Sequence, residues 1–234
     1  MIQPHGGRLV DRVLVGKDKE AALARAGRLP RLTVDSELIS DIENIATGVY
    51  SPLEGFLCEA DFRSVLAGSR LESDVAWTVP IVLDADAATA AGLKTGAEAL
   101  LAAEDGRPVA VLHLREKYGY DKGEMAERIF GTRDPAHPGV ARVMGMKDTL
   151  LAGPVDLIEA TPTPFDRWKL APKETRVLFE AKGWRTVVGF QTRNTPHLGH
   201  EYVQKAALTF TDGLSLNPAI GRKQKGDFKD EVIL

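Results

Sequence analysis

Cysteine is almost absent from this sequence of 234 residues, which contains only Cys58. A single cysteine cannot form a disulfide within the chain, so a small secreted domain held together by disulfides is excluded. There are also no cysteine pairs or clustered histidines with the spacing of zinc ligands. We therefore expect a protein of a reducing compartment, the cytoplasm, with no metal site of its own.

Long apolar runs and a strong charge of either sign are missing as well. No window approaches the length of a membrane-spanning helix, and the first residues, MIQPHGGRLVDRVLV, lack the apolar core of a signal peptide. The net charge is only -3, so binding to nucleic acid would require a local basic patch. We expect neither a membrane nor a nucleic-acid partner.

The first 160 or so residues have short strand patterns. WTVPIVL (77–83) is a β-branched run, and AEALLAA and VAVLHL flank the turn EDGRP. In that turn, Asp105-Gly106 can adopt the positive φ that a hairpin requires. These patterns predict a compact β-rich domain with antiparallel pairing rather than a βαβ repeat.

Helix patterns lie between these strands. DSELISDIENI (35–45) begins with Asp35 or Ser36 as a capping residue, and EADFRSVLAG (59–68) has apolar residues at helical spacing. The alanine-rich piece ADAATAAG (85–92) predicts a short helix or a turn.

A break occurs at TPTPFDRW (161–168), where two prolines disfavour regular structure. We predict domains at 1–163 and 164–234. The second begins with a helix, APKETRVLFEAKGW, that has Pro172 in its first turn and Gly183 at its end. The strand WRTVVGF, the helix HEYVQKAAL and the strand LSLNPAI follow, which is the order of an α/β domain with a parallel sheet. A further helix begins at GDFKDEVIL, so roughly 70 residues of this domain are present, fewer than a doubly wound domain needs.

The segment QTRNTPHLGH (191–200) lies where the predicted strand meets a helix. The N-terminus of such a helix offers unpaired N–H groups to an anion. His197 and His200 are three residues apart, which would place both imidazoles on one face. Arg193 supplies a planar fork for an oxyanion, and Gln191 and Asn194 supply neutral hydrogen-bonding groups. Gly199 leaves room for a nucleotide to approach between the histidines.

No residue in this segment resembles an activated nucleophile, and Cys58 has no evident base partner. The pattern therefore favours direct transfer of a phosphoryl or nucleotidyl group, with the histidines and Arg193 stabilising charge in the transition state. The alternative is that the two histidines only cap the helix or face solvent.

The stretch GFQTRNTPHLGHEYVQKAAL closely resembles the signature of the ATP sulfurylase (sulfate adenylyltransferase) family of bacteria and archaea. The same resemblance extends to further segments in the family's order: PHGGRLVDR, GVYSPLEGFL, YGYDKGEMAERIFGTRDPAHPGV and DGLSLNPAIGRKQKGDFKDEVI. It implies a PUA-like β-rich domain followed by part of a Rossmann-like nucleotidyltransferase domain with an HxGH motif. The full-length enzyme is expected to be a homo-oligomer.

The resemblance also implies a reaction, in which ATP and sulfate give adenosine 5'-phosphosulfate and pyrophosphate. Mg²⁺ would arrive with ATP as MgATP and would not be held by a recognisable protein site. Gln191 and Arg193 would bind sulfate, and the ATP site would use six residues of the segment: Gln191, Thr192, Arg193, Asn194, His197 and His200. The catalytic residues would be the last five of these.

Two departures from the family pattern stand out. The proline lies one position later, in Asn194-Thr195-Pro196-His197, but the spacing from Asn to His is kept. The family's later Gly-Arg-Asp-His-Ala-Gly motif does not occur in these residues. We therefore expect little or no sulfurylase activity from the isolated chain.

Other interpretations stay open. The basic stretch 222–229 is either a solvated loop or an arm near the phosphates, and His5 is either a tail residue or an interdomain contact. His137 and the SPLEGF stretch are expected to be structural. The alternatives to a sulfurylase are another HxGH nucleotidyltransferase, which would usually carry the motif near its N-terminus, and an RNA-binding PUA-like fragment, which would need a basic aromatic platform.

Overall fold

The computed structural model describes residues 2–221 and 226–233. The chain divides into two compact units, an N-terminal unit of Pro4–Pro172 and a C-terminal unit made of residues 1–3 and 173–234. This division lies in the first turn of a helix, so the boundary predicted after residue 163 stays a prediction.

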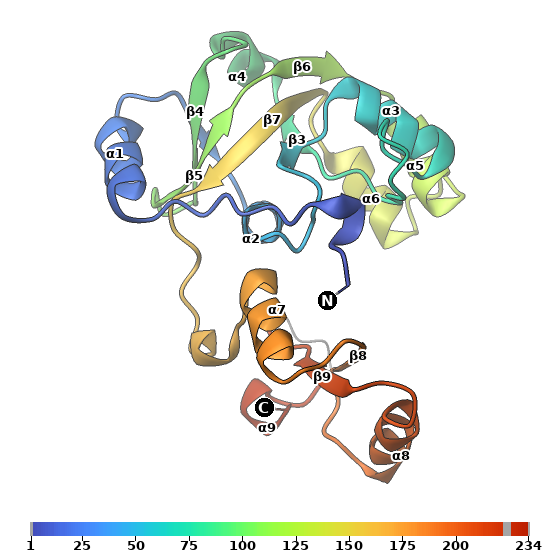
Figure 1. The fold of residues 1–234 in the computed structure, drawn as a ribbon. Coiled ribbons are helices and arrows are strands. Elements are labelled where there is room, and N and C mark those ends of the chain that lie inside the picture. Colours follow the sequence, from blue (N-terminus) through green and yellow to red (C-terminus); the bar gives the residue numbers. More distant parts are fainter. Residues whose placement is uncertain (1, 222–225, 234) are drawn as a thin grey trace. The chain divides into compact units, whose positions relative to one another are not determined.

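The N-terminal unit is β-rich, as expected, and combines seven strands with helices among its described residues (Figure 1). Its strands are β1 (Arg31–Thr33), β2 (Gly55–Phe56), β3 (Leu83–Ala85), β4 (Glu98–Ala102), β5 (Pro108–His113), β6 (Glu116–Gly119) and β7 (Thr149–Leu157). Its α-helices are α1 (Gly16–Ala26), α2 (Ser36–Thr47), α3 (Glu59–Gly68), α4 (Ala87–Gly92), α5 (Lys122–Phe130) and α6 (Pro138–Gly145), with short 3₁₀ turns η1 (His5–Gly7) and η2 (Asp166–Trp168).

The sheet follows the order β1-β4-β5-β7-β2, and β3 and β6 also pair with β7. All pairs are antiparallel except β1 with β4. The predicted hairpin is confirmed: β4 and β5 are joined through Gly106, whose φ is 86°. That positive φ suits glycine, which has no Cβ to clash with the backbone.

The predicted helices are confirmed, and one predicted strand is wrong. Asp35 caps α2 by accepting hydrogen bonds from the backbone N–H groups of Glu37 and Leu38. Of the run 77–83, only Leu83 belongs to a strand, since β3 begins there. Pro80 has no N–H for a sheet ladder, and Trp77 donates its backbone N–H to Ser69 in a loop instead.

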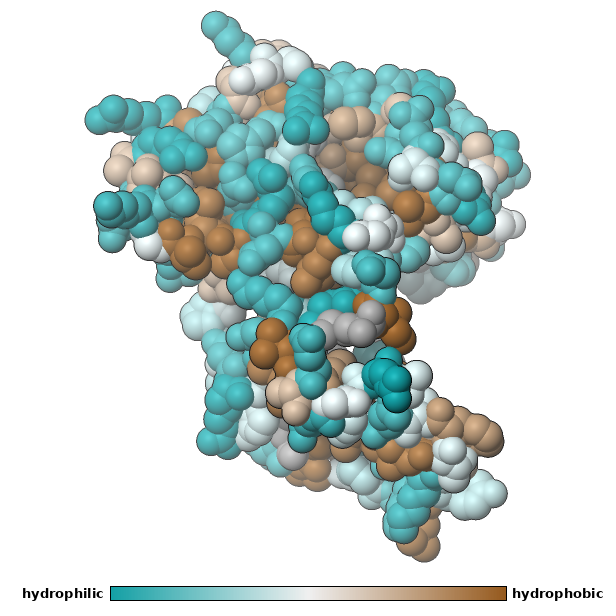
Figure 2. Space-filling view, viewed as in Figure 1, coloured by the Kyte–Doolittle hydropathy of each residue, from teal (hydrophilic) through white to brown (hydrophobic). Residues whose placement is uncertain are grey.

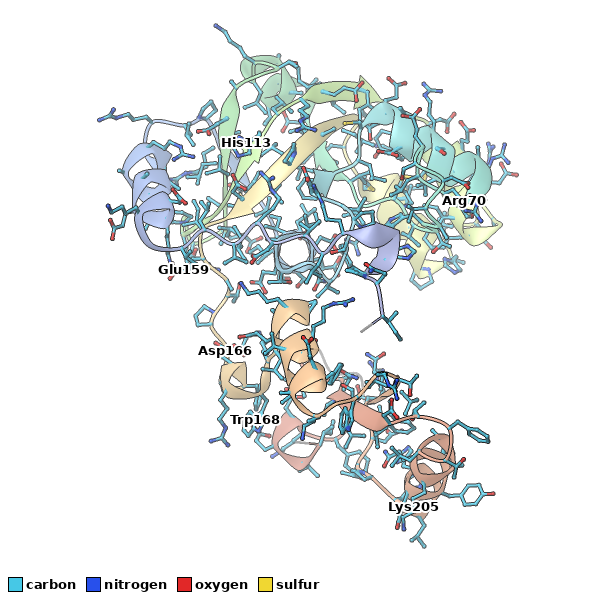
Figure 3. The ribbon with its side chains drawn as sticks, in the orientation of Figure 1. Arg70, His113, Glu159, Asp166, Trp168 and Lys205 are labelled. Atoms are coloured by element: carbon cyan, nitrogen blue, oxygen red, sulfur yellow. The ribbon has the colours of Figure 1, made fainter. Side chains whose placement is uncertain are left out.

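Three clusters of buried side chains form the core of this unit. The first lies between α2 and the sheet and includes Ile42 and Leu112; the second joins α3, α5 and α6; and the third packs α1 on the sheet. Figure 1 shows α1 at one end of the sheet and the group α3, α5 and α6 at the other. Polar side chains also link neighbouring strands of the sheet: His113 on β5 (labelled in Figure 3) lies 2.6 Å from Asp156 on β7.

The C-terminal unit contains the predicted alternation of helices and strands. Its elements are α7 (Pro172–Ala181), β8 (Val187–Thr192), α8 (Leu198–Ala207), β9 (Gly213–Pro218) and α9 (Asp230–Ile233). β8 and β9 are parallel, with Val187 opposite Gly213 and Gln191 opposite Asn217. Gly183 has a φ of 72° just after α7, which confirms the predicted helix end.

Few side chains of the C-terminal unit are buried within it. Ile233 is the only hydrophobic residue of its described part that is buried, while Leu198, Tyr202 and Phe210 are 82%, 76% and 87% exposed. Hydrophobic side chains are visible on its surface in Figure 2. Across the described residues, no helix is long and apolar enough to cross a membrane.

Candidate functional site

The candidate site begins at the carboxyl end of β8. Because β8 and β9 are parallel, their last residues lie at the same edge: Gln191 is opposite Asn217 and Thr192 is opposite Pro218. The backbone continues this pairing, since Ala219 N–H donates to the Thr192 carbonyl at 2.8 Å. Asn217 was not singled out from the sequence, although an Asn-Pro pair at the end of the second predicted strand was a usable signal.

The other end of β8 is fixed by Asp212, which precedes β9. One carboxylate oxygen of Asp212 accepts hydrogen bonds from the backbone N–H groups of Thr186 at 2.8 Å and Arg185 at 2.9 Å. These bonds, first that from Thr186, hold the pKa of Asp212 below its usual value. Gly213 follows, where a Cβ would lie 2.1 Å from the Trp184 ring, so glycine is required for this close packing.

The turn after β8 presents the polar residues predicted from the sequence. Thr192 Oγ1 accepts a hydrogen bond from the backbone N–H of Asn194 at 3.0 Å, which shapes the turn. Gln191, Arg193 and Asn194 are exposed, and Thr192 is half-buried. The Arg193 guanidinium lies 3.8 Å from a carboxylate oxygen of Asp227, so its charge faces an acidic neighbour within this unit.

His197 is the residue that begins α8. It lies just before the first helical residue, with φ -142° and ψ 173°, and its Nδ1 accepts a hydrogen bond from the backbone N–H of Gly199 at 3.1 Å. Since Nδ1 acts as the acceptor, the neutral ring carries its proton on Nε2. The capping role considered for the histidines is therefore real for His197, and its Nε2 is left as a donor.

The imidazole of His200 stacks on that of His197. Their ring centres are 3.8 Å apart with an angle of 26° between the planes. His197 precedes the helix rather than lying within it, but the two rings meet as the spacing predicted. A Cβ at Gly199 would lie 3.0 Å from His197 Cε1, so glycine also leaves space for this ring, and the predicted space for a nucleotide stays a prediction.

Phe190 contributes a third ring that sequence reasoning missed. Its ring centre is 5.6 Å from that of His200, with the planes at 72°, an edge-to-face arrangement. Nδ1 of His200 is buried and has no hydrogen-bond partner among the described residues. The only available signal was the position of Phe190, one residue before the polar segment on a strand.

The arrangement as a whole can bind an anion. The start of α8, a helix of ten residues, offers unpaired backbone N–H groups and the positive end of its dipole. The imidazole pair and Arg193 bring further donors to the same strand-to-helix turn. Within the described residues there is no group of three or more His, Cys, Asp or Glu side chains that could hold a metal ion. The basic residues Arg222, Lys223 and Lys225 of the stretch 222–229 lie outside the described residues.

Two families match the two parts of the chain. Residues 2–160 match the family described as PUA-like domain, and residues 166–234 match the family described as ATP-sulfurylase. Both agree with the fold expected from the sequence.

Curated relatives match nearly the whole chain and are longer than it. A protein of Hyperthermus butylicus named sulfate adenylyltransferase is 54% identical over 232 residues, which are 99% of this chain and 59% of that protein. Proteins with the same name from Aeropyrum pernix and Symbiobacterium thermophilum are 53% and 48% identical, covering 99% of this chain and 61% and 59% of theirs. The chain thus spans about 60% of the length of these relatives.

A solved structure shares the fold. The protein titled hexameric APS kinase from Thiobacillus denitrificans matches with a TM-score of 0.73 and 28% sequence identity, covering 95% of this chain and 40% of that one.

Proposed function

Because this chain belongs to the ATP-sulfurylase family, with a PUA-like domain over residues 2–160, we propose that it acts in the transfer of an adenylyl group from ATP to sulfate. The products would be adenosine 5'-phosphosulfate and pyrophosphate. The observation that carries the proposal is the stacked pair of His197 and His200 at the start of α8, in the strand-to-helix turn that also contains Gln191 and Arg193.

The chemistry needs no protein nucleophile. A sulfate oxygen forms a bond to the α-phosphorus while the bond from that phosphorus to the oxygen bridging to the β-phosphate breaks. Pyrophosphate leaves with the electron pair of that bond. Negative charge grows on the leaving group and on the α-phosphate oxygens, so fixed donors facing those oxygens lower the barrier.

Each of the six predicted site residues has a part in this scheme. Arg193 and Gln191 bind sulfate, the guanidinium with its planar fork and the amide as a neutral donor. His197 and His200 donate from Nε2 to the phosphates, since Nδ1 of His197 is occupied by Gly199 and Nδ1 of His200 is buried. Thr192 and Asn194 shape the turn through their hydrogen bond and contact the nucleotide.

Mg²⁺ enters as part of the substrate, MgATP. The donor set of the turn, a guanidinium, two imidazoles and amides, suits phosphate oxygens and not the cation. The metal would neutralise charge on the β- and γ-phosphates when ATP is bound.

Three broader statements belong to the proposal. The isolated 234-residue chain is a poor catalyst, because its relatives are longer and it spans 59% of the Hyperthermus butylicus protein. The active protein is a homo-oligomer. It works in the cytoplasm, in keeping with a chain that has one cysteine.

The test is sulfate-dependent release of pyrophosphate from ATP, using the longest product of the gene that contains this sequence. Arg193→Ala is expected to lower turnover roughly 100-fold or more, as expected for loss of one donor to a developing charge. Arg185→Ala is the matched control, because Arg185 is an exposed arginine two residues before β8, at the end opposite the candidate site. Release that does not depend on sulfate, or equal losses in both variants, would refute the proposed reaction.

Running the assay with nicotinamide mononucleotide or phosphopantetheine in place of sulfate tests the other HxGH transferases. A salt-dependent RNA shift assay tests the binding-module alternative.

A further inference from the structure

The ring of Phe190 lies on the side of β8 that faces His200, the histidine whose ring it contacts. Side chains alternate along a strand, so Phe190 shares a face with Val188 and Thr192, while Gln191 points to the other face. Phe190 is half-buried, and its ring edge meets the ring of His200 at a centre distance of 5.6 Å. The ring of Phe190, on the strand, therefore packs against the imidazole of His200, on α8.

The two histidines are held in different ways. His197 has a hydrogen bond at Nδ1, from the backbone N–H of Gly199. His200 has no such bond at Nδ1 to any described residue, although this atom is buried. Ring packing, against Phe190 on one side and His197 on the other, is thus what orients His200.

We propose that Phe190 is a positioning residue for the imidazole pair. Its ring fixes the plane of His200, and the stack transmits this orientation to His197, so that Nε2 of both rings is directed to one anion. This inference rests on the proposed function, in which that anion is the phosphate chain of ATP. Phe190 touches no reacting atom itself.

The direct test removes the ring but keeps the bulk. Phe190→Leu in the 234-residue chain is expected to weaken MgATP binding roughly fivefold, the scale of one aromatic pair, which corresponds to about 1 kcal/mol. Phe190→Tyr keeps the ring edge and should bind MgATP as the original chain does. Calorimetric titration measures both.

The matched control is Phe179→Leu in the same unit. Phe179 is also half-buried and also packs on an aromatic ring, with its ring centre 5.8 Å from that of Trp184. Its ring partner is Trp184 and not a histidine, so its loss should leave MgATP affinity within about twofold of the original. Equal weakening by Phe179→Leu and Phe190→Leu would overturn the proposal, because the effect would then be general destabilisation.

A second measurement requires no nucleotide. Histidine ring signals in NMR spectra report ring currents from neighbouring aromatic groups, and the chain has five histidines. In Phe190→Leu the signals of His200 and His197 should shift, while those of His5, His113 and His137 stay in place. Unchanged signals of His200 would overturn the positioning role.

The two readouts separate the proposals. If Phe190→Leu shifts the signals of His200 but the longest product of the gene binds no MgATP, the proposed function fails while the support of His200 by Phe190 stands. If MgATP binds and Phe190→Leu binds it equally well, the positioning role fails while the proposed function stands.

Discussion

Two helices of this protein, α6 and α8, begin with the same local structure. His137 precedes α6 and His197 precedes α8, and in each case Nδ1 accepts a hydrogen bond from the backbone N–H of a glycine two residues later, at 3.1 Å. The sequences are His-Pro-Gly and His-Leu-Gly. The capping geometry alone therefore does not distinguish a structural histidine from one at a candidate site.

The difference lies in the neighbouring rings. His137 packs against Phe130 with ring centres 4.9 Å apart, beside a cluster of buried side chains. His197 stacks on a second histidine, and Arg193 lies four residues earlier in the same strand-to-helix turn. One capping histidine packs on a ring that borders a hydrophobic core, and the other adds a donor to a group of cationic and polar side chains.

The largest expected effect is on sulfate-dependent turnover, which should depend on one capping histidine and not on the other. His197→Ala should lower sulfate-dependent turnover roughly 100-fold, because a donor to the developing charge is lost. His137→Ala should leave turnover within about twofold of the original, since His137 lies in the other unit. Both variants should lose about 1 kcal/mol of helix stability, the usual scale of a cap. Steady-state kinetics and urea unfolding measure the two quantities.

A loss of turnover in His137→Ala as large as in His197→Ala would contradict the assignment of His197 to the site and of His137 to a structural role. It would also indicate that the kinetic effect of either variant comes from unfolding.

The capping glycines sharpen the comparison with a smaller effect. A Cβ at Gly139 would lie 2.4 Å from the end of the Phe130 ring, whereas at Gly199 it would lie 3.0 Å from the ring of His197. Gly139→Ala should therefore cost about 1–3 kcal/mol through overpacking. Gly199→Ala should change stability by less than about 0.5 kcal/mol, because an exposed ring can move.

MgATP affinity should give the reverse order for the same pair of variants. Gly199→Ala should weaken MgATP binding several-fold by turning His197, and Gly139→Ala should not. Thermal unfolding and calorimetric titration of both variants check this, and weaker MgATP binding in Gly139→Ala alone would contradict it.

Local signals in the sequence predicted most of the fold. Asp35 specifies the start of a helix through its capping side chain, and Asp105-Gly106 specifies a turn through the positive φ that glycine allows; both predictions are confirmed. β7 was not identified, because Gly153 and Pro154 interrupt it, and a glycine-proline pair usually ends a strand. Its pairing with four other strands overrides that preference, and a Cβ at Gly153 would meet the carbonyl oxygen of His113 at 2.0 Å.

The candidate site was predictable in its residue types but not in its contacts. The spacing of His197 and His200 indicated that the rings are neighbours. It could not indicate that Phe190 packs on His200 or that Asp227 faces Arg193, because both contacts join segments separated in sequence. Whether the six predicted residues act as proposed stays a prediction.

The central claim is that His197 and His200 bind the phosphates of one nucleotide, and titration of MgATP into the 234-residue chain tests it most directly. Histidine ring signals would be followed by NMR, with each histidine assigned by substitution. The account predicts that the signals of His197 and His200 move together along one saturating curve, while those of His5, His113 and His137 do not move. Saturable binding that leaves the signals of His197 and His200 unchanged would contradict it.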